Sequence, residues 1–219
     1  MSELTPQQRI RCMIALVAAL AVVSITSSLN WPILSEALRN QGYSESMIGI
    51  NAAAQFAGII VVALAAPRII PALGFFKAIA LGMIVLAVTI IALPAFRSFE
   101  TWLVIRFLLG MGNSLLFTAG DTWMNQIVDD RVRGRWMGIY VTAGMAGWAV
   151  GPLLGAYLDP DTYWPFVWGL LAIVVAAGFL LPTRKLDIKL NVPEHGVALG
   201  LAAVFFAAPT VLLASAMFG

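Results

Sequence analysis

Long apolar runs separated by short polar connections dominate the chain. Seven of these runs are long enough to cross a bilayer, because a membrane-spanning helix needs about 20 mostly apolar residues. They lie at residues 11–35, 46–66, 77–94, 101–127, 136–158, 164–181 and 196–218. The strands of a membrane barrel would instead alternate apolar and polar positions over about 10 residues. The pattern therefore predicts an all-α membrane protein with seven transmembrane helices.

The composition supports this class and excludes several others. Hydrophobic residues make up 61% of the 219 residues and charged residues 11%, against about 25% charged in a soluble domain. A soluble enzyme, a disordered tail and a nucleic-acid binder are excluded, and a net charge of +2 implies no anionic partner. The single cysteine, Cys12, excludes an intrachain disulfide framework and a cysteine-rich metal site. No phosphate-loop, zinc-protease or serine-hydrolase motif occurs, so we expect no enzyme activity, no metal and no cofactor.

The basic residues predict the orientation. Ten of them flank one side of the membrane, whereas only Arg39 and Arg97 flank the other and Arg106 lies inside the fourth run. Positive charge gathers on the cytoplasmic side, so we expect a multi-pass inner-membrane protein with a cytoplasmic N-terminus. The predicted organisation is a six-helix transmembrane unit at 1–181, a cytoplasmic linker at 182–195 and a seventh helix at 196–219.

Arg106 is the most informative polar residue within the runs. A buried guanidinium costs at least about 2.5 kcal/mol on insertion, so it usually faces a cavity or a partner, although its depth also permits snorkelling to the outer headgroups. Asn113 follows on the same face, and Gly110 and Gly112 open space beside it. Asp121 stands near the cytoplasmic end of the same helix, about 22 Å from Arg106, so the two are no direct pair. It is either a proton carrier or an interfacial partner of the arginines at 131, 133 and 135.

Further polar residues mark the first, second and fifth runs, whereas the third and sixth are almost purely apolar. This division predicts a cavity lined by the first, second, fourth and fifth helices, with the other two facing lipid. The candidate lining residues are Asn30, Trp31, Asn51, Gln55, Arg106, Asn113 and Trp148. Each alone is more often an interhelical hydrogen bond than a ligand contact.

Two segments suggest packing or gating. Gly147, Gly151 and Gly155 share a face of the fifth helix beside Pro152, which predicts either ordinary close packing or a deformable helix at a moving interface. The stretch PRIIPALGFFK contains Arg68, Gly74 and Lys77 and predicts a tight cytoplasmic turn. Its cations either set the topology or form a latch on a cytoplasmic gate.

Four motifs together resemble the major facilitator superfamily, and the resemblance covers essentially the whole chain. Arg68, Gly74 and Lys77 match in kind the signature of the loop between helices two and three, with Pro67 where the family has an aspartate. The other three motifs are the arginine and spaced glycines of helix four (Arg106, Gly110, Gly112), the loop DDRVRGRWMG, and the helix-five signature common in exporters (Gly147, Gly151, Pro152, Gly155). The stretch DTWMN at 121–125 is also similar to one poorly characterised bacterial branch.

The resemblance implies a secondary transporter with alternating access. That family has two six-helix halves, each built from 3+3 inverted repeats, with the substrate site between the halves. We expect proton-coupled export of small organic molecules by a half-length chain embedded in the lipid bilayer. The glycine face of helix five would lack its partner helix. We therefore expect either a fragment or truncated product, or a half that assembles with a second copy or another membrane chain through this face. The alternative is a non-transport, facilitator-like subunit that scaffolds or assists another membrane complex.

Overall fold

Six long helices make up the part of the chain that the computed structural model describes, residues 5–160 and 162–186. They are α1 (Pro6–Asn40), α2 (Glu45–Leu73), α3 (Phe75–Ala95), α4 (Phe99–Ile127), α5 (Arg133–Gly155) and α6 (Trp164–Leu180), followed by the short 3-10 helix η1 (Leu181–Leu186). All six are long and apolar enough to cross a membrane, which confirms the predicted all-α membrane class. The predicted linker begins in η1, and the rest of it and the seventh helix lie outside the described residues.

Helices α1 to α4 extend past the apolar runs that predicted them, whereas α5 and α6 end one to three residues before theirs. Helix α1 has 35 residues and is therefore about 50 Å long, whereas the hydrocarbon core of a bilayer is about 30 Å thick. Its first turn is closed by a capping box, in which the Thr5 hydroxyl accepts from the Gln8 amide and the Gln8 side chain accepts from the Thr5 amide. The apolar pattern indicates which part of a helix lies in lipid, whereas backbone hydrogen bonds and caps determine where the helix begins and ends.

The connection between α2 and α3 is much shorter than the sequence suggests. Helix α2 continues through Pro67 and Pro71, and the single residue Gly74 then links it to α3. Gly74 has φ of +83°, a conformation that favours glycine because it lacks a Cβ. The predicted turn is therefore mostly helix, and only its glycine makes the reversal.

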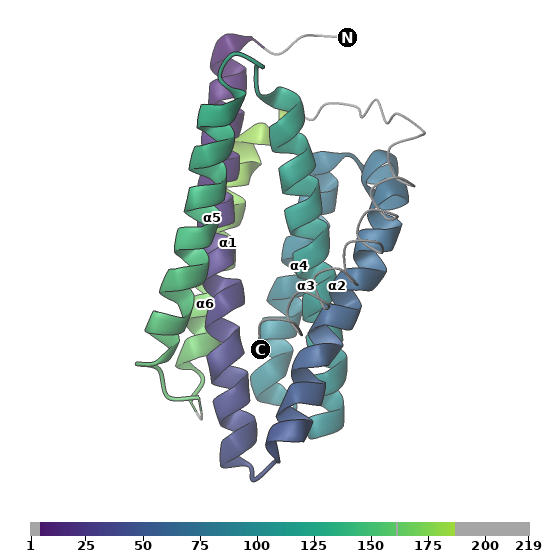
Figure 1. The fold of residues 1–219 in the computed structure, drawn as a ribbon, viewed down its shortest axis with the longest axis vertical. Helices are drawn as coiled ribbons and strands as arrows, with labels where there is room; N and C mark the ends of the chain where they lie inside the picture. The colour runs from purple at the N-terminus through teal and green to yellow at the C-terminus, as the bar shows by residue number, and fades with distance from the viewer. Residues whose placement is uncertain (1–4, 161, 187–219) are drawn as a thin grey trace, which may run out of the picture. The chain divides into compact units, whose positions relative to one another are not determined.

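The described helices pack as two groups of three. Helix α1 packs against α5 and α6, and α4 packs against α2 and α3; α3 also contacts α6. Figure 1 shows these two sets, with α1 beside α5 and α4 beside α2. The first helix of each predicted three-helix repeat thus packs on the second and third helices of the other repeat, which agrees with the inverted-repeat arrangement.

The glycine face of α5 is already occupied. A Cβ placed on Gly147 would lie 2.6 Å from the Ala21 carbonyl oxygen of α1, and one placed on Gly155 would lie 3.0 Å from Pro32. The Ser28 hydroxyl of α1 also donates to the Gly147 carbonyl oxygen at 3.2 Å. The prediction that this face lacks a partner within the chain is wrong, because the glycines let α1 itself approach closely. No second chain is needed to cover it.

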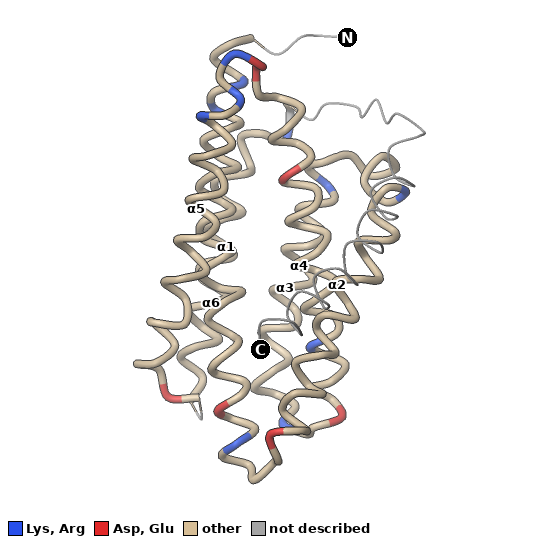
Figure 2. The backbone as a smooth tube through the Cα atoms, viewed as in Figure 1, with Lys and Arg blue, Asp and Glu red and all other residues tan. Residues whose placement is uncertain are grey.

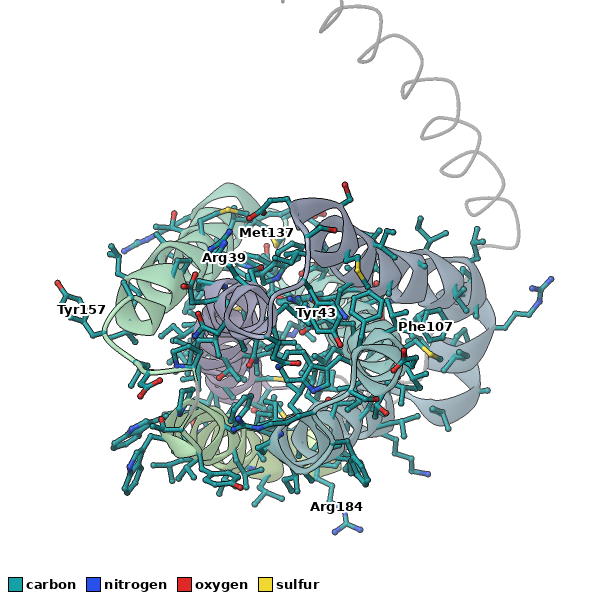
Figure 3. All side chains as sticks on the ribbon, turned by 90° about the horizontal axis from the view of Figure 1, so that it is seen from below. Arg39, Tyr43, Phe107, Met137, Tyr157 and Arg184 are labelled. Atoms are coloured by element: carbon teal, nitrogen blue, oxygen red, sulfur yellow. The ribbon has the colours of Figure 1, made fainter. Side chains whose placement is uncertain are left out.

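The outward faces of the helices suit a lipid environment. Large apolar side chains such as Ile60, Ile84 and Met145 are more than half exposed on them. Charged residues lie mostly toward the ends of the bundle, with Lys and Arg gathered toward the end that holds the N-terminus (Figure 2). At the opposite end Arg39 pairs with Glu36 and Glu45, at 2.6 and 3.1 Å. Figure 3 shows Tyr157, which is 89% exposed, pointing away from the helices.

The packing of α1 on α5 predicts how substitutions on the glycine face behave. We expect Gly151→Ala to lower the stability of the chain in detergent by about 1–3 kcal/mol, because the new Cβ would meet backbone atoms of Ile25 and Leu29. Gly138→Ala on the same helix is the control, since its Cβ would meet nothing within 4 Å. Thermal unfolding followed by circular dichroism measures both. Equal midpoints would contradict the close α1–α5 contact.

Candidate functional site: a buried arginine cluster between helices α1, α2 and α4

Arg106 lies inside the helix bundle. It is the eighth residue of α4, about 10 Å from the start of that helix, and its side chain is only 1% exposed. Its Nε donates to the Asn51 side-chain oxygen at 3.0 Å and its Nη1 to the Gln55 side-chain oxygen at 2.8 Å. The guanidinium therefore points toward α2 and does not reach outward as a snorkelling arginine would.

Two glycines allow α2 to come this close. A Cβ on Gly110 of α4 would clash with the Gln55 carbonyl oxygen, and a Cβ on Gly58 of α2 would clash with the Phe107 carbonyl oxygen. The Ser114 hydroxyl adds a bond from α4 to the Ile59 carbonyl oxygen of α2, at 3.0 Å. Small residues at such crossings let helix backbones touch in a membrane. The backbone contact places Asn51 and Gln55 within reach of Arg106.

Helix α1 covers the guanidinium with an aromatic ring. The Arg106 Cζ lies 5.6 Å from the centroid of the Trp31 ring, within the range of a cation–π interaction. Trp31 in turn meets Phe56 of α2 edge-on, with ring centroids 5.3 Å apart. Arg106, Asn51, Gln55 and Trp31, which we call the arginine cluster, thus come from three helices.

A second polar group adjoins the arginine cluster. The Ser27 hydroxyl of α1 donates to the Asn113 side-chain oxygen of α4 at 2.7 Å. Asn113, Asn30 and Gln55 help to line a cavity of about 10 Å³, which is room for about one water molecule. Leu86 and Ile90 of α3 complete its wall. The polar interior thus lies among α1, α2, α3 and α4, whereas the sequence predicted α5 in place of α3. One side of α3 faces this interior and not the lipid.

Asp121 lies apart from the arginine cluster. Its carboxylate accepts a hydrogen bond from the Tyr140 hydroxyl of α5, and the glycine at 120 leaves room for that hydroxyl beside α4. Within the described residues Arg133 pairs with Asp130 at 2.7 Å, and Asp121 makes no salt bridge. The structure therefore offers no ionic partner for Asp121 among the described arginines at 131, 133 and 135.

The other predicted site residues do not join the arginine cluster. Trp148 of α5 is 39% exposed, because the α5 face that meets α1 carries the glycines and leaves the tryptophan outside. Arg68 and Lys77 flank Gly74 with exposed side chains, and Pro152 lies exposed within α5.

A larger cavity of about 380 Å³ between α1, α5 and α6 is lined by apolar residues apart from Thr26 and Tyr157.

Gly58 and Tyr140 were not foreseen as contributors, and Ser27 was visible only as part of the polar side of the first helix. Nothing local in the sequence sets Gly58 or Tyr140 apart from other small or aromatic residues. Gly58 follows Gln55 by three positions, so the two lie on the same side of α2. That spacing was the one available signal that Gln55 faces a close helix crossing.

Comparisons with known proteins place the chain in a family of membrane proteins. The family model described as Major Facilitator Superfamily matches residues 16–219. A weaker likeness is to a Bacillus subtilis (strain 168) protein named "Uncharacterized MFS-type transporter YfkF", 22% identical over 152 residues. The aligned segment covers 69% of this chain and 39% of that protein, so this chain matches about two fifths of its relative's length.

The contact between α2 and α4 can be tested at Gly110. We expect Gly110→Ala to destabilise the chain by about 1–3 kcal/mol or more, because the added Cβ must displace the α2 backbone at Gln55. Gly178→Ala on α6, where nothing lies within 4 Å of the new Cβ, should leave the midpoint unchanged or slightly raised. Melting in detergent compares the two variants. If Gly110→Ala and the control have the same midpoint of thermal unfolding, the helices do not cross as closely as described.

Proposed function

The chain belongs to the Major Facilitator Superfamily, and on that basis we propose that it is part of a secondary transporter that moves small organic molecules by alternating access. The observation that carries the proposal is the arginine cluster, a fully buried cation held by neutral side chains within a membrane-spanning bundle. Ionisable residues in such positions usually serve a transport path, because their burial is costly.

The arrangement of the helices supports a moving site. Trp31 belongs to the group α1, α5 and α6, whereas Arg106 and Asn51 belong to the group α2, α3 and α4. The contacts between Trp31 and Arg106 and between Ser27 and Asn113 cross from one group to the other. A change in the angle between the groups would therefore alter the arginine cluster directly.

Proton coupling is the finer part of the proposal, and Asp121 is its candidate. The Tyr140–Asp121 hydrogen bond joins α5 to α4 and so also crosses between the groups. A charged Asp121 accepts from the tyrosine, whereas a protonated one can also donate. Gain or loss of a proton would thus change a contact on which the relative position of the groups depends. Arg68, Gly74 and Lys77 at the α2–α3 turn are the corresponding candidates for a cytoplasmic gate.

The alternative of a scaffolding subunit drew on the expected unpartnered face of α5. Because α1 covers Gly147, Gly151 and Gly155, no described contact favours that alternative. We therefore place the exporter hypothesis first.

Flux measurements test the proposal. In vesicles loaded with a pH-sensitive dye, we expect organic solutes from a mixed panel to collapse an imposed proton gradient only when the chain is present. Asp121→Asn should abolish that proton movement, because an amide cannot carry the proton. Glu100→Gln, an exposed acidic residue in the first turn of the same helix, is the control. Proton movement that survives in Asp121→Asn would remove Asp121 from the proposed coupling.

The orientation is testable by labelling from the two sides of the membrane. In a variant whose buried Cys12 is replaced by Ala, we expect Arg131→Cys to react from the cytoplasmic side and Arg39→Cys from the opposite side. The reason is the gathering of positive charge at the end that holds Arg131. Reaction of both cysteines from one side would overturn the orientation.

A further inference from the structure

Arg106 carries a charge that the described bundle does not neutralise. It is the one charged residue among the buried polar residues of the described part. The described acidic residues, at 36, 45, 100, 121, 129, 130 and 159, are all exposed. The hydrogen-bond partners of Arg106 are the neutral oxygens of Asn51 and Gln55. A hydrogen bond from a guanidinium to a neutral oxygen is weaker than one to a carboxylate. The two amides therefore offset less of the desolvation penalty of the cation, which amounts to several kcal/mol.

The neighbouring polar groups add donors to this charge. Because the Asn51 oxygen accepts from Arg106, the Asn51 Nδ2 must find another acceptor, and it has none among the described residues. The Trp31 Nε1, on the ring that covers the guanidinium, is likewise buried without a described acceptor. Asn51 itself is 0% exposed. A buried donor without an acceptor costs about 1–3 kcal/mol, so the arginine cluster combines excess positive charge with unmatched N–H groups.

We propose that the arginine cluster binds the carboxylate of an organic acid, and that such an acid is the transported substrate. This names the substrate class and so rests on the function proposed above. A guanidinium offers a planar fork of donors that fits a carboxylate, and the Asn51 Nδ2 and Trp31 Nε1 supply further N–H groups beside it. A cation would meet like charge and unmatched N–H donors here.

The surroundings also indicate the body of the ligand. Trp31 is only partly buried, and Phe56, which meets it edge-on, is 51% exposed. The two rings form a partly exposed aromatic surface, and Trp31 lies directly against the guanidinium. Aromatic rings offer an apolar surface to the part of a ligand that carries no charge. The site therefore suits an acid with an apolar or aromatic body better than an inorganic anion.

Direct binding tests this proposal without a need for transport. The whole chain in detergent would be titrated with radiolabelled benzoate and then challenged with unlabelled benzoate, benzamide, benzylammonium and inorganic phosphate. These probes share a ring and differ in charge, except phosphate, which has the charge without the ring. We expect saturable binding that unlabelled benzoate displaces and the other three do not. Equal displacement by benzamide or benzylammonium would overturn the role of charge, and displacement by phosphate would make the site one for inorganic anions.

A nearly isosteric variant separates binding from folding. Asn51→Asp places a carboxylate beside Arg106, so the cation gains a partner within the chain. We expect the variant to melt no lower than the original chain and yet to lose benzoate binding by at least about tenfold, since an internal acid replaces the external one. Trp31→Phe keeps an aromatic ring, although a smaller one, and removes the N–H, so it should weaken binding. Arg97→Gln removes an exposed arginine and should bind as the original does.

The outcomes divide the two proposals. Undiminished benzoate binding in Asn51→Asp, or no binding by the folded original chain, would overturn the acid site. If binding fails while vesicles still show solute-driven proton movement, the transporter proposal stands with another substrate class. If benzoate binds as expected but no solute moves protons or crosses the vesicle membrane, the transporter proposal falls and the acid site stands.

Discussion

The close contact of backbones at glycines is the constraint on which the rest of the bundle depends. Lipid tails are as apolar as leucine side chains, so helices in a bilayer gain mainly from van der Waals packing and interhelical hydrogen bonds. Gly58 and Gly110 bring α2 onto α4, and Gly147 and Gly151 bring α5 onto α1. Only at that separation can Asn51 and Gln55 reach Arg106, or Ser28 reach the Gly147 carbonyl oxygen. The positions of these glycines therefore decide which polar side chains of the interior can form hydrogen bonds.

The proposed acid site implies a compromise between stability and substrate binding at a buried cation held by amides. Its two hydrogen bonds contribute about 1.5–3 kcal/mol each and the tryptophan ring about 2, against a desolvation penalty of several kcal/mol. A carboxylate at Asn51 or Gln55 would complete the ion pair, but it would also remove any attraction for an external anion. Neutral partners hold the guanidinium in position and leave its charge available. That balance connects the packing of α2 on α4 to the proposed substrate.

Helix α1 joins the two groups through polar residues on different faces. Ser28 faces α5, where it bonds the Gly147 carbonyl oxygen, whereas Ser27 and Trp31 face α4, where they meet Asn113 and Arg106. The sequence shows these residues as one polar stretch, but the five positions from 27 to 31 cover more than a full helical turn. The same helix therefore serves as a packing surface for one group and as part of the arginine cluster for the other.

The sequence by itself determined the class, the approximate positions of six helices, the family and the expectation that Arg106 faces a partner inside the bundle, because lipid imposes apolar runs of defined length and makes a buried charge conspicuous. The i,i+4 pair of Asn51 and Gln55 was visible for the same reason. Only the tertiary structure decided which glycine meets which helix, that Trp148 lies outside the arginine cluster, and that α1 fills the face of α5 expected to need another chain. A glycine pattern shows that a helix can be approached closely, but every helix in a bilayer presents a similar apolar surface, so the identity of the neighbour depends on the arrangement of the whole bundle.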